Sequence, residues 1–407
     1  MRILMISDVY FPRVNGVSTS IQTYRQDLEQ LGHSCTLIAP AYTAGHAADD
    51  ERILRVESRG VPRDPEDRRM LRRRIRGLLP RLAAERFEVV HVQTPFVAHY
   101  AGIELARALG LPVVESYHTY FEHYLQHYVP ALPSSWLKYA ARRFTVSQCS
   151  QVDAVISPSR QMADALRDYG VKTRIEVLPT GLNPTRFTPA IGARFRARHG
   201  IGAHRPMLLF VGRIAFEKNI DFLIHLLPKL RQRVAEVLLV IAGEGPAEAH
   251  CRALVRKLGV EEHVHFVGYM NRDTELLDCY RAADAFVFAS RTETQGLVLL
   301  EAMAQGTPAI STAVMGTVDV LQNARGAVVV PEDTDAFVAA ITELLGDPAR
   351  RAALSEQARH DAEHWSSVAM ARRLIALYES VTQVRGFTEA SSPRHLHVAA
   401  GAQDRAA

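Results

Sequence analysis

The chain has 407 residues, of which 47% are hydrophobic and 23% are charged, and its formal net charge is +4. Such a chain is too long for one ordinary core, so we expect two globular domains of roughly 150 to 200 residues, and the small net charge argues against a dedicated nucleic-acid-binding protein. Every apolar run is well short of the roughly 20 residues that span a bilayer, and residues 1–7 are typical of a strand instead of a signal peptide, so we expect a cytoplasmic location.

Short apolar, β-branched runs alternate with helical patterns along the whole chain. This alternation is typical of parallel sheets that are covered by helices on both faces. The predicted strands of the first half are 2–7, 35–40, 89–94, 112–119, 153–159 and 175–179. The predicted strands of the second half are 206–212, 236–243, 264–269, 285–290, 308–313 and 327–330. The sequence therefore predicts an α/β fold with two Rossmann-like parallel-sheet domains facing a cleft.

Three further segments define the organisation of the chain. Residues 179–190, PTGLNPTRFTPA, are rich in proline, glycine and asparagine and predict a linker, whereas 365–381 have helical periodicity after a serine cap signal. The tail from Gly386 onward is small and polar and is predicted to be disordered. The cysteines Cys35, Cys149, Cys251 and Cys279 are scattered, so we expect buried, reduced thiols without a zinc site or a disulfide framework.

Two motifs of the first half follow predicted strands. Asn15-Gly16 supplies a tight turn before a helix that begins near Val17, where backbone amides could face a phosphate, although a purely structural turn explains the dipeptide nearly as well. His118 leaves a strand where the cleft should open and could contact a sugar or an acceptor hydroxyl, or it could be an ordinary structural histidine. The HxxxH spacing at 123–127 lacks a third ligand, so we predict no metal site.

The segment VGRIAFEKN, residues 211–219, follows the first strand of the second half. Arg213 and Lys218 flank a bend between that strand and the next helix, so both cations could converge on a diphosphate. The alternative is a surface arrangement in which Lys218 is solvated and Arg213 pairs with a neighbouring acid. Neither this segment nor GEGP at 243–246 matches the GxGxxG fingerprint, which disfavours a nicotinamide-dependent oxidoreductase.

Glu293 and Glu301 lie eight residues apart in SRTETQGLVLLEAMAQGTP, residues 290–308. On one continuous helix they would lie about 80° apart and would not share a face. Gly296 permits unusual backbone angles, so we expect Glu293 on a loop and Glu301 on a helix over 297–305. Two carboxylates beside a cationic pair and a helix N-terminus can accept hydrogen bonds from sugar and ribose hydroxyls, a combination that predicts a site for a nucleotide-diphosphate sugar.

These motifs resemble those of the retaining glycosyltransferases of family four, which have the GT-B fold. The resemblance covers residues 1 to about 382. Its carriers are NGV at 15–17, PTGLNPTRF at 179–187, GR and EKN within 212–219, and the pair Glu293 and Glu301. The fold implies an acceptor-binding domain at 1–182, a donor-binding domain at 188–365, a C-terminal helix at 366–385 that crosses back to the first domain, and a tail at 386–407.

The resemblance also implies the site residues. The implied catalytic residues are His118 beside the donor sugar, Arg213 and Lys218 on the donor diphosphate, and Glu293 on the transferred sugar. The implied donor-binding residues are Asn15, Gly16, Val17, Gly212, Glu244, Gly245, Tyr269, Met270, Thr294, Gln295, Gly296, Leu297 and Glu301, the last on the ribose hydroxyls. The donor would be a UDP-sugar or GDP-sugar, with no further cofactor and no metal.

The form TETQGL at 292–297 and YHTYFEHY at 117–124 are similar to the diacylglycerol glucosyltransferases, which transfer glucose from UDP-glucose to a membrane lipid. Nine arginines lie between Arg63 and Arg86. Residues 67–87 could form a basic amphipathic helix that binds an anionic membrane on the inner face of the cytoplasmic membrane, or an ordinary surface helix. The predicted membrane or acceptor contacts are Arg68, Arg69, Arg72, Arg73 and Arg76.

Other functions remain open from the sequence. The nearest is a mannosyl- or glucosyltransferase that acts on a soluble glycan or a lipopolysaccharide precursor. A non-catalytic nucleotide-sugar-binding protein and a sugar epimerase with this fold are further alternatives. The sequence leaves the donor base, the sugar, the acceptor and the oligomeric state undetermined.

Overall fold

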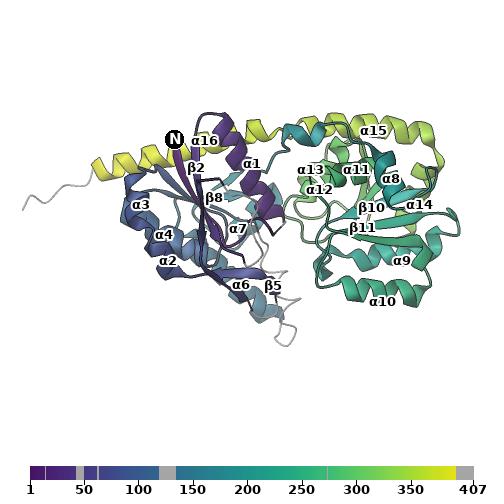
Figure 1. Ribbon diagram of the computed structural model, residues 1–407, viewed down its shortest axis with the longest axis horizontal. Helices are drawn as coiled ribbons and strands as arrows, with labels where there is room; N and C mark the ends of the chain where they lie inside the picture. The colour runs from purple at the N-terminus through teal and green to yellow at the C-terminus, as the bar shows by residue number, and fades with distance from the viewer. Residues whose placement is uncertain (14, 43–49, 62–63, 119–133, 273, 391–407) are drawn as a thin grey trace, which may run out of the picture.

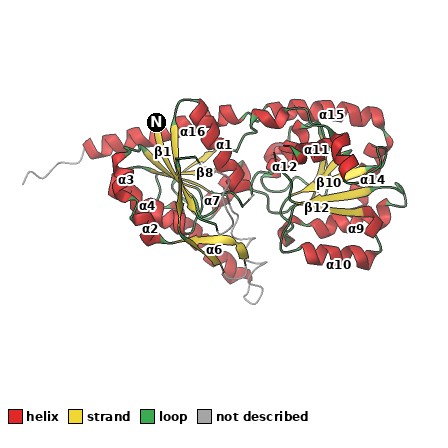
Figure 2. Ribbon diagram, viewed as in Figure 1, coloured by secondary structure: helices red, strands yellow, loops and turns green. Residues whose placement is uncertain are grey.

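The computed structural model describes residues 1–13, 15–42, 50–61, 64–118, 134–272 and 274–390. Two α/β halves lie next to each other (Figure 1), with α15 (Pro348–Glu363) along the second half and the C-terminal helix α16 (Ser367–Ala390) along the first. Each half has a central sheet with helices packed on its two faces (Figure 2). This layering is the predicted fold class.

The first half contains a seven-stranded parallel sheet with the order β3-β2-β1-β6-β7-β8-β9. Its strands are β1 (Arg2–Ile6), β2 (Ser34–Pro40), β3 (Ile53–Val56), β6 (Val89–Val92), β7 (Val113–Ser116), β8 (Ala154–Ser157) and β9 (Arg174–Val177). A separate antiparallel hairpin consists of β4 (Ser58–Val61) and β5 (Asp64–Met70).

The second half contains a six-stranded parallel sheet with the order β12-β11-β10-β13-β14-β15. Its strands are β10 (Met207–Val211), β11 (Leu238–Ala242), β12 (Val264–Gly268), β13 (Ala285–Phe288), β14 (Ala309–Ser311) and β15 (Ala327–Val329). The central strands are buried along their full length, because helices cover both faces of the sheet. All twelve strands expected from the apolar runs are present.

The helices of the first half are α1 (Gly16–Gln30), α2 (Arg72–Arg76), α3 (Leu79–Ala84), α4 (Val97–Leu109), α6 (Ser134–Cys149) and α7 (Arg160–Asp168). Those of the second half are α8 (Gly192–Arg198), α9 (Ile220–Leu230), α10 (Glu248–Leu258), α11 (Glu275–Ala282), α12 (Leu297–Ala304), α13 (Thr317–Leu321), α14 (Thr334–Gly346) and α15 (Pro348–Glu363). Short 3₁₀ turns are η1 (Pro184–Phe187), η2 (Phe216–Lys218) and η3 (Glu261–His263), and α16 (Ser367–Ala390) closes the chain.

Helix α16 returns to the first half, as the fold predicted. Leu374, Leu377 and Tyr378 are buried in the same core cluster as Tyr24 of α1. The return begins where the linker meets the start of α16, because Leu182 forms a parallel bridge with Ser366. The helix continues through 386–390, the start of the predicted tail, and the rest of that tail lies outside the described residues.

Residues 67–87 do not form the single amphipathic helix that their spacing suggested. They comprise the end of β5, the short helices α2 and α3, and the turns between them. Met70, Ile75 and Leu82 are buried in the core of the first half, with Leu78 and Leu79 packed against it. The apolar side chains of this segment are therefore used for folding, and Pro80 lies in the first turn of α3.

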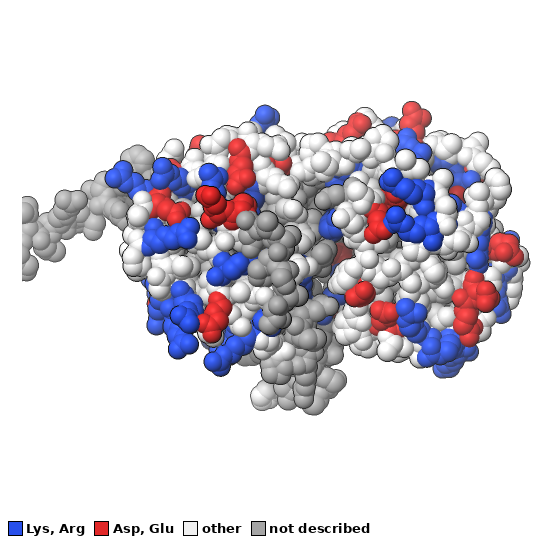
Figure 3. Space-filling model, in the orientation of Figure 1, with Lys and Arg blue, Asp and Glu red and all other residues white. Residues whose placement is uncertain are grey.

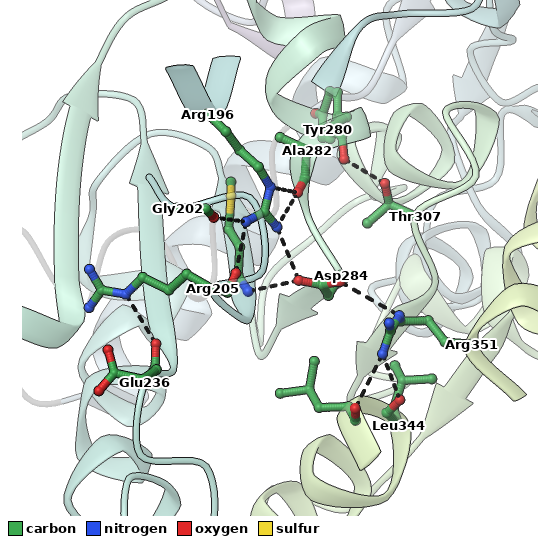
Figure 4. Close-up of polar contacts among 12 residues, drawn as sticks. Arg196, Gly202, Arg205, Glu236, Tyr280, Ala282, Asp284, Thr307, Leu344 and Arg351 are labelled. Atoms are coloured by element: carbon green, nitrogen blue, oxygen red, sulfur yellow. Dashed lines mark hydrogen bonds and ion pairs between the residues drawn. The ribbon is translucent and has the colours of Figure 1, made fainter. Parts of the chain in front are cut away.

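The carboxylate of Asp284 connects the amino ends of two strands of the second sheet, β10 and β13, to neighbouring helices (Figure 4). Asp284 Oδ2 accepts hydrogen bonds from the Met207 amide at 2.9 Å and from Arg196 Nη2 at 3.1 Å, and its Oδ1 lies 3.6 Å from Arg351 Nε. Arg196 belongs to α8 and Arg351 to α15, so Asp284 joins two helices to the starts of β10 and β13. This cluster is structural and lies at the edge of the sheet away from the predicted site.

We expect Asp284→Ala to lower the free energy of unfolding by about 2 kcal/mol, because the amide of the buried Met207 would lose its acceptor and Arg196 would lose its carboxylate partner. Urea denaturation of the purified protein measures this change. Asp335→Ala is the matched control, since Asp335 pairs with Lys229 on the surface with a side chain that is 73% exposed. Equal stabilities of the two variants would contradict the role of Asp284.

Candidate functional site

Three loops lie side by side at the carboxyl ends of β10, β11 and β12. The Gly212 amide donates to Ala242 O at 3.0 Å, and the Ile214 amide donates to Glu244 O at 2.9 Å. The Gly243 amide in turn donates to Gly268 O at 2.9 Å. The structure thus brings together the GR, GEG and GYM segments that the resemblance assigned to the donor.

The loops after β10 and β11 approach each other so closely that the loop after β11 requires a glycine at position 243. A Cβ atom on Gly243, whose φ is +129°, would lie 2.0 Å from the Gly212 carbonyl oxygen. Only a residue without a side chain permits this contact. The backbone of the predicted donor site is therefore tightly packed.

Lys218 and Glu293 come from separate segments and form an ion pair. Lys218 ends η2, whereas Glu293 lies on the loop between β13 and α12, as predicted. Their side chains are 21% and 16% exposed, so the pair is only partly solvated. Asn219, in the left-handed region at φ +56°, holds the two segments together, because its Nδ2 donates to Ala289 O at 3.1 Å.

Glu301 lies on α12, which begins after Gly296 as predicted, since Gly296 adopts φ +90°. The Glu301 side chain is 4% exposed and forms an ion pair with Arg272. Its Oε2 also accepts a hydrogen bond from the Tyr280 hydroxyl at 2.9 Å. A carboxylate has about four acceptor positions, so these two partners leave capacity for hydroxyl groups of a ligand.

The predicted turn at Asn15 begins α1, and the Asn15 side chain caps the helix by accepting from the Ser18 amide at 2.8 Å. A Cβ atom on Gly16 would meet no other atom within 4 Å. Neither packing nor a left-handed backbone therefore requires a glycine at this helix N-terminus. Because Gly16 has no side chain, the backbone amides at the start of α1 stay accessible, which is compatible with the predicted phosphate contact.

His118 follows β7 and is half-buried. Its Nε2 lies 3.1 Å from Oε1 of Gln93, the residue after β6. Burial lowers the pKa of His118 to about 4, so the imidazole is neutral at physiological pH. The HxxxH spacing at 123–127 lies outside the described residues.

Gln295 connects the predicted donor loop to the linker. Its Oε1 accepts from the Thr180 amide at 2.8 Å, and its Nε2 donates to Thr180 O at 2.6 Å. The Thr180 hydroxyl lies 2.7 Å from that of Ser20 on α1. Gln295 is 4% exposed, so these contacts form a buried connection between the halves.

Two aspartates with the spacing of a metal-binding motif have structural partners. The expectation of a metal-free site assumed that the sequence has no Asp-x-Asp motif, but residues 333–335 are Asp-Thr-Asp. Asp333 caps α14 by accepting from the Ala336 amide at 2.9 Å, and Asp335 pairs with Lys229. Among the described residues, no group of three or more His, Cys, Asp or Glu could hold a metal ion. All four cysteines are free and buried, as predicted.

The surface of the first half exposes basic side chains around α2. Lysines and arginines gather on the part of the surface that α2 occupies (Figures 1 and 3). Arg72 and Arg76 share Glu104 as an ion-pair partner, and Arg68 donates to Ser58 Oγ at 3.2 Å. Arg69 and Arg73 are exposed.

Helix α6 of the first half carries two exposed aromatic side chains, Trp136 at 76% and Tyr139 at 66% exposed. The opposite face of α6 buries Leu137 and Ala141. In the part of the chain that the structure describes, none of the helices has the length and apolar character that crossing a membrane requires.

Sequence reasoning missed several polar residues around the site, namely Gln93, Asn219, Arg272 and Tyr280. Gln93 lies near the end of the predicted strand 89–94 and Asn219 ends the segment 211–219, so their positions offered a signal. Arg272 and Tyr280 had none, because their contacts with Glu301 depend on how α11 and the loop before it pack beside α12.

The sequence matches the family model described as Glycosyltransferase Family 4 over residues 14–186 and the model described as Glycosyl transferases group 1 over residues 193–361. An alpha-monoglucosyldiacylglycerol synthase of Streptococcus pneumoniae is 36% identical over 76% of this chain and 71% of its own length. A GDP-mannose-dependent alpha-(1-6)-phosphatidylinositol monomannoside mannosyltransferase of Mycolicibacterium smegmatis is 30% identical over 94% of this chain and 99% of its own.

The fold is also similar to solved structures. A sucrose-phosphate synthase from Thermosynechococcus elongatus superposes with a TM-score of 0.76 over 94% of this chain and 99% of its own, at 22% sequence identity. Because the likeness covers 94% of this chain, it includes most of both halves and supports the two-domain architecture.

We expect Gln295→Glu to reduce turnover about tenfold at pH 8 and to recover as the pH falls toward about 6. An ionised carboxylate would repel the Thr180 carbonyl oxygen, whereas the protonated acid would donate to it in place of the amide. Initial rates across this range, each relative to the native protein, measure the effect. Gln232→Glu, at an exposed position of the second half, is the control. A loss of turnover that does not change with pH would contradict this role of the contact between Gln295 and Thr180.

Proposed function

This chain belongs to the family 4 glycosyltransferases, and we propose that it transfers a hexose, with retention, from a nucleotide-diphosphate sugar to a lipid acceptor at an anionic membrane surface. The sugar that we propose is glucose and the acceptor is of the diacylglycerol type. The observation that carries the proposal is the combination of a Lys218–Glu293 pair in the cleft loops with 36% identity to a glucosyldiacylglycerol synthase.

The donor would bind at the carboxyl ends of β10 to β13. We assign Arg213 and Lys218 to its diphosphate, because Arg offers a planar fork and Lys a compact point charge. Glu293 would accept hydroxyl groups of the hexose, and Glu301 those of the ribose. The amides at the start of α1, across the cleft, would complete the phosphate contacts.

In the reaction that we propose, the bond between the sugar C1 and the diphosphate oxygen breaks while the acceptor hydroxyl oxygen bonds to C1 on the same face. The acceptor proton passes to the departing phosphate oxygen. Negative charge develops on the leaving diphosphate, and Arg213, Lys218 and the helix-end amides would stabilise it without a metal ion. Lys218 would exchange Glu293 for the diphosphate as the donor enters.

The acceptor membrane would meet the side of the first half that carries α2 and α6. Tryptophan and tyrosine favour the membrane interface, since their rings are apolar and their polar groups stay hydrated. Exposed arginines add about 1 kcal/mol each near an anionic surface. Because the apolar residues of 67–87 are in the core, Trp136 and Tyr139 are the better candidates for insertion.

A second candidate is transfer of mannose from GDP-mannose, which the mannosyltransferase similar over 94% of the chain favours. The same cations and acids would serve either donor. Purified protein given a panel of UDP- and GDP-sugars with lipid or soluble glycan acceptors, and analysed by mass spectrometry, separates these functions. Product from a soluble glycan alone would overturn the lipid acceptor.

We expect Lys218→Ala to lower turnover by about 100-fold or more, because the leaving diphosphate would lose a cation that stabilises the transition state. Steady-state rates with the best donor of the panel measure the loss. Lys229→Ala is the control, since it also removes one cation of an ion pair but lies on the surface. Near-normal turnover of Lys218→Ala with intact folding would refute the assignment.

We expect the double variant Trp136→Ser, Tyr139→Ser to bind vesicles of phosphatidylglycerol and phosphatidylcholine about tenfold more weakly than the native protein. Co-sedimentation at low salt measures binding. Ile191→Ser is the matched control, because Ile191 is an exposed apolar side chain of the second half at 56% exposure. Failure of the native protein to bind at low salt would contradict a membrane acceptor.

A further inference from the structure

A row of buried polar side chains connects His118 to the C-terminal helix. Beyond the contact of His118 with Gln93, the Gln93 Nε2 lies 3.1 Å from Nδ1 of His91 on β6. The same Nδ1 lies 2.6 Å from the hydroxyl of Tyr378 on α16. His91 Nε2 lies 2.8 Å from Ser116 Oγ on β7. His91, Gln93 and Tyr378 are all 0% exposed.

The hydrogen bonds of this row fix where the protons lie. An amide nitrogen only donates and an amide oxygen only accepts. His91 Nδ1 is therefore an acceptor, and its single lone pair is shared between the Tyr378 hydroxyl and Gln93, whose Nε2 also donates to Met5 Sδ at 3.8 Å. His91 then carries its proton on Nε2, from which it donates to Ser116. At the other end, Gln93 Oε1 requires His118 to carry its proton on Nε2.

The opposite orientation of the Gln93 amide is less favourable. It would place a proton on His91 Nδ1 and make the Tyr378 hydroxyl its acceptor. The buried Tyr378 proton would then have no acceptor among the described residues, where His91 is the hydroxyl's hydrogen-bond partner. An unsatisfied buried donor costs about 1 to 3 kcal/mol, so the first arrangement prevails.

We infer that Gln93, backed by His91 and Tyr378, is a positioning residue that holds His118 in the neutral Nε2–H tautomer, so that Nδ1 accepts a hydrogen bond from a sugar or acceptor hydroxyl. The inference deepens the proposed function, because it rests on His118 lying beside the transferred sugar. A neutral, oriented acceptor is what a hydroxyl group needs, whereas an imidazolium could only donate.

The surroundings support a neutral ring. The titratable side chains of the row are His91 on β6 and Tyr378 on α16, and Ser116 and Gln93 are uncharged. Burial alone lowers the pKa of His118 to about 4, and burial together with His118 lowers that of His91 to about 3. A purely structural network would account for the contacts of His91 and Tyr378. It would not need to extend to the half-buried ring of His118, which follows a strand.

The first test measures the tautomer directly. Full-length protein with ¹⁵N-labelled histidine gives long-range ¹H–¹⁵N spectra in which the two neutral tautomers differ, and His118→Asn assigns the signal by its loss. We expect the Nε2–H tautomer at pH 7 and a neutral ring down to about pH 5.5, given the low pKa. An Nδ1–H tautomer or an imidazolium at pH 7 would overturn the inference.

The second test places a charge at Gln93. In Gln93→Glu the carboxylate favours the charged ring and raises the pKa of His118, so hexose transfer should fall about tenfold between pH 8 and pH 5.5 while the native profile stays flat. Gln93→Met, of similar volume, should lose activity equally at all pH values. A Gln93→Glu profile parallel to the native one overturns the inference.

The two tests separate failure of the inference from failure of the proposed function. A native protein that transfers no hexose from any donor refutes the proposed function, and the tautomer measurement still decides the role of Gln93. If Gln93→Glu does not fold, Tyr378→Phe replaces it, because it keeps the buried ring and removes only the hydroxyl donor. We expect Tyr378→Phe to populate the other His118 tautomer, and an unchanged spectrum contradicts the inference.

Discussion

Parallel strand pairing is the constraint on which the site depends. All strands of a parallel sheet end at the same edge, so the loops after β10, β11, β12 and β13 must emerge together. Here the loops also contact each other, with a hydrogen bond from Ile214 to Glu244 O and a backbone approach at Gly243 that excludes any side chain. The charged residues on these loops are therefore held by a rigid backbone, which favours preorganised binding of a polar ligand.

The two halves form one site only if something sets their relative position. Three contacts do so at different points: Gln295 on Thr180, the Arg160 amide on Asp319 at 2.7 Å, and α16 against α1. A Cβ on Gly181 would lie 2.4 Å from the Ser367 Cα, so the linker and the returning chain also pass each other in close contact. Among the described residues, each of these contacts is local, which is compatible with a boundary between domains that admit and release ligands.

Sequence patterns predicted the sheets well and the polar partners poorly. Strands such as 238–242 are buried on both faces, so their apolar runs are unambiguous. By contrast, β5 reads DPEDRRM and has no apolar run, and the leucines and arginines of 67–87 have helical spacing although their backbone changes direction. The cleft residues Arg213, Lys218, Glu293 and Glu301 were predicted because each lies in a strand-end motif, and their ligand contacts remain predictions.

The charges of the cleft are arranged so that they neutralise one another before a donor arrives. Lys218 pairs with Glu293, and Arg272 pairs with Glu301. Unpaired charges at these partly buried positions would lose hydration without compensation. A nucleotide-diphosphate sugar brings both anionic phosphates and hydroxyl donors, so it can replace each partner with a group of matching character. Binding would then proceed by exchange of hydrogen bonds. The unfavourable free energy of removing these charges from water would already have been offset when the protein folded.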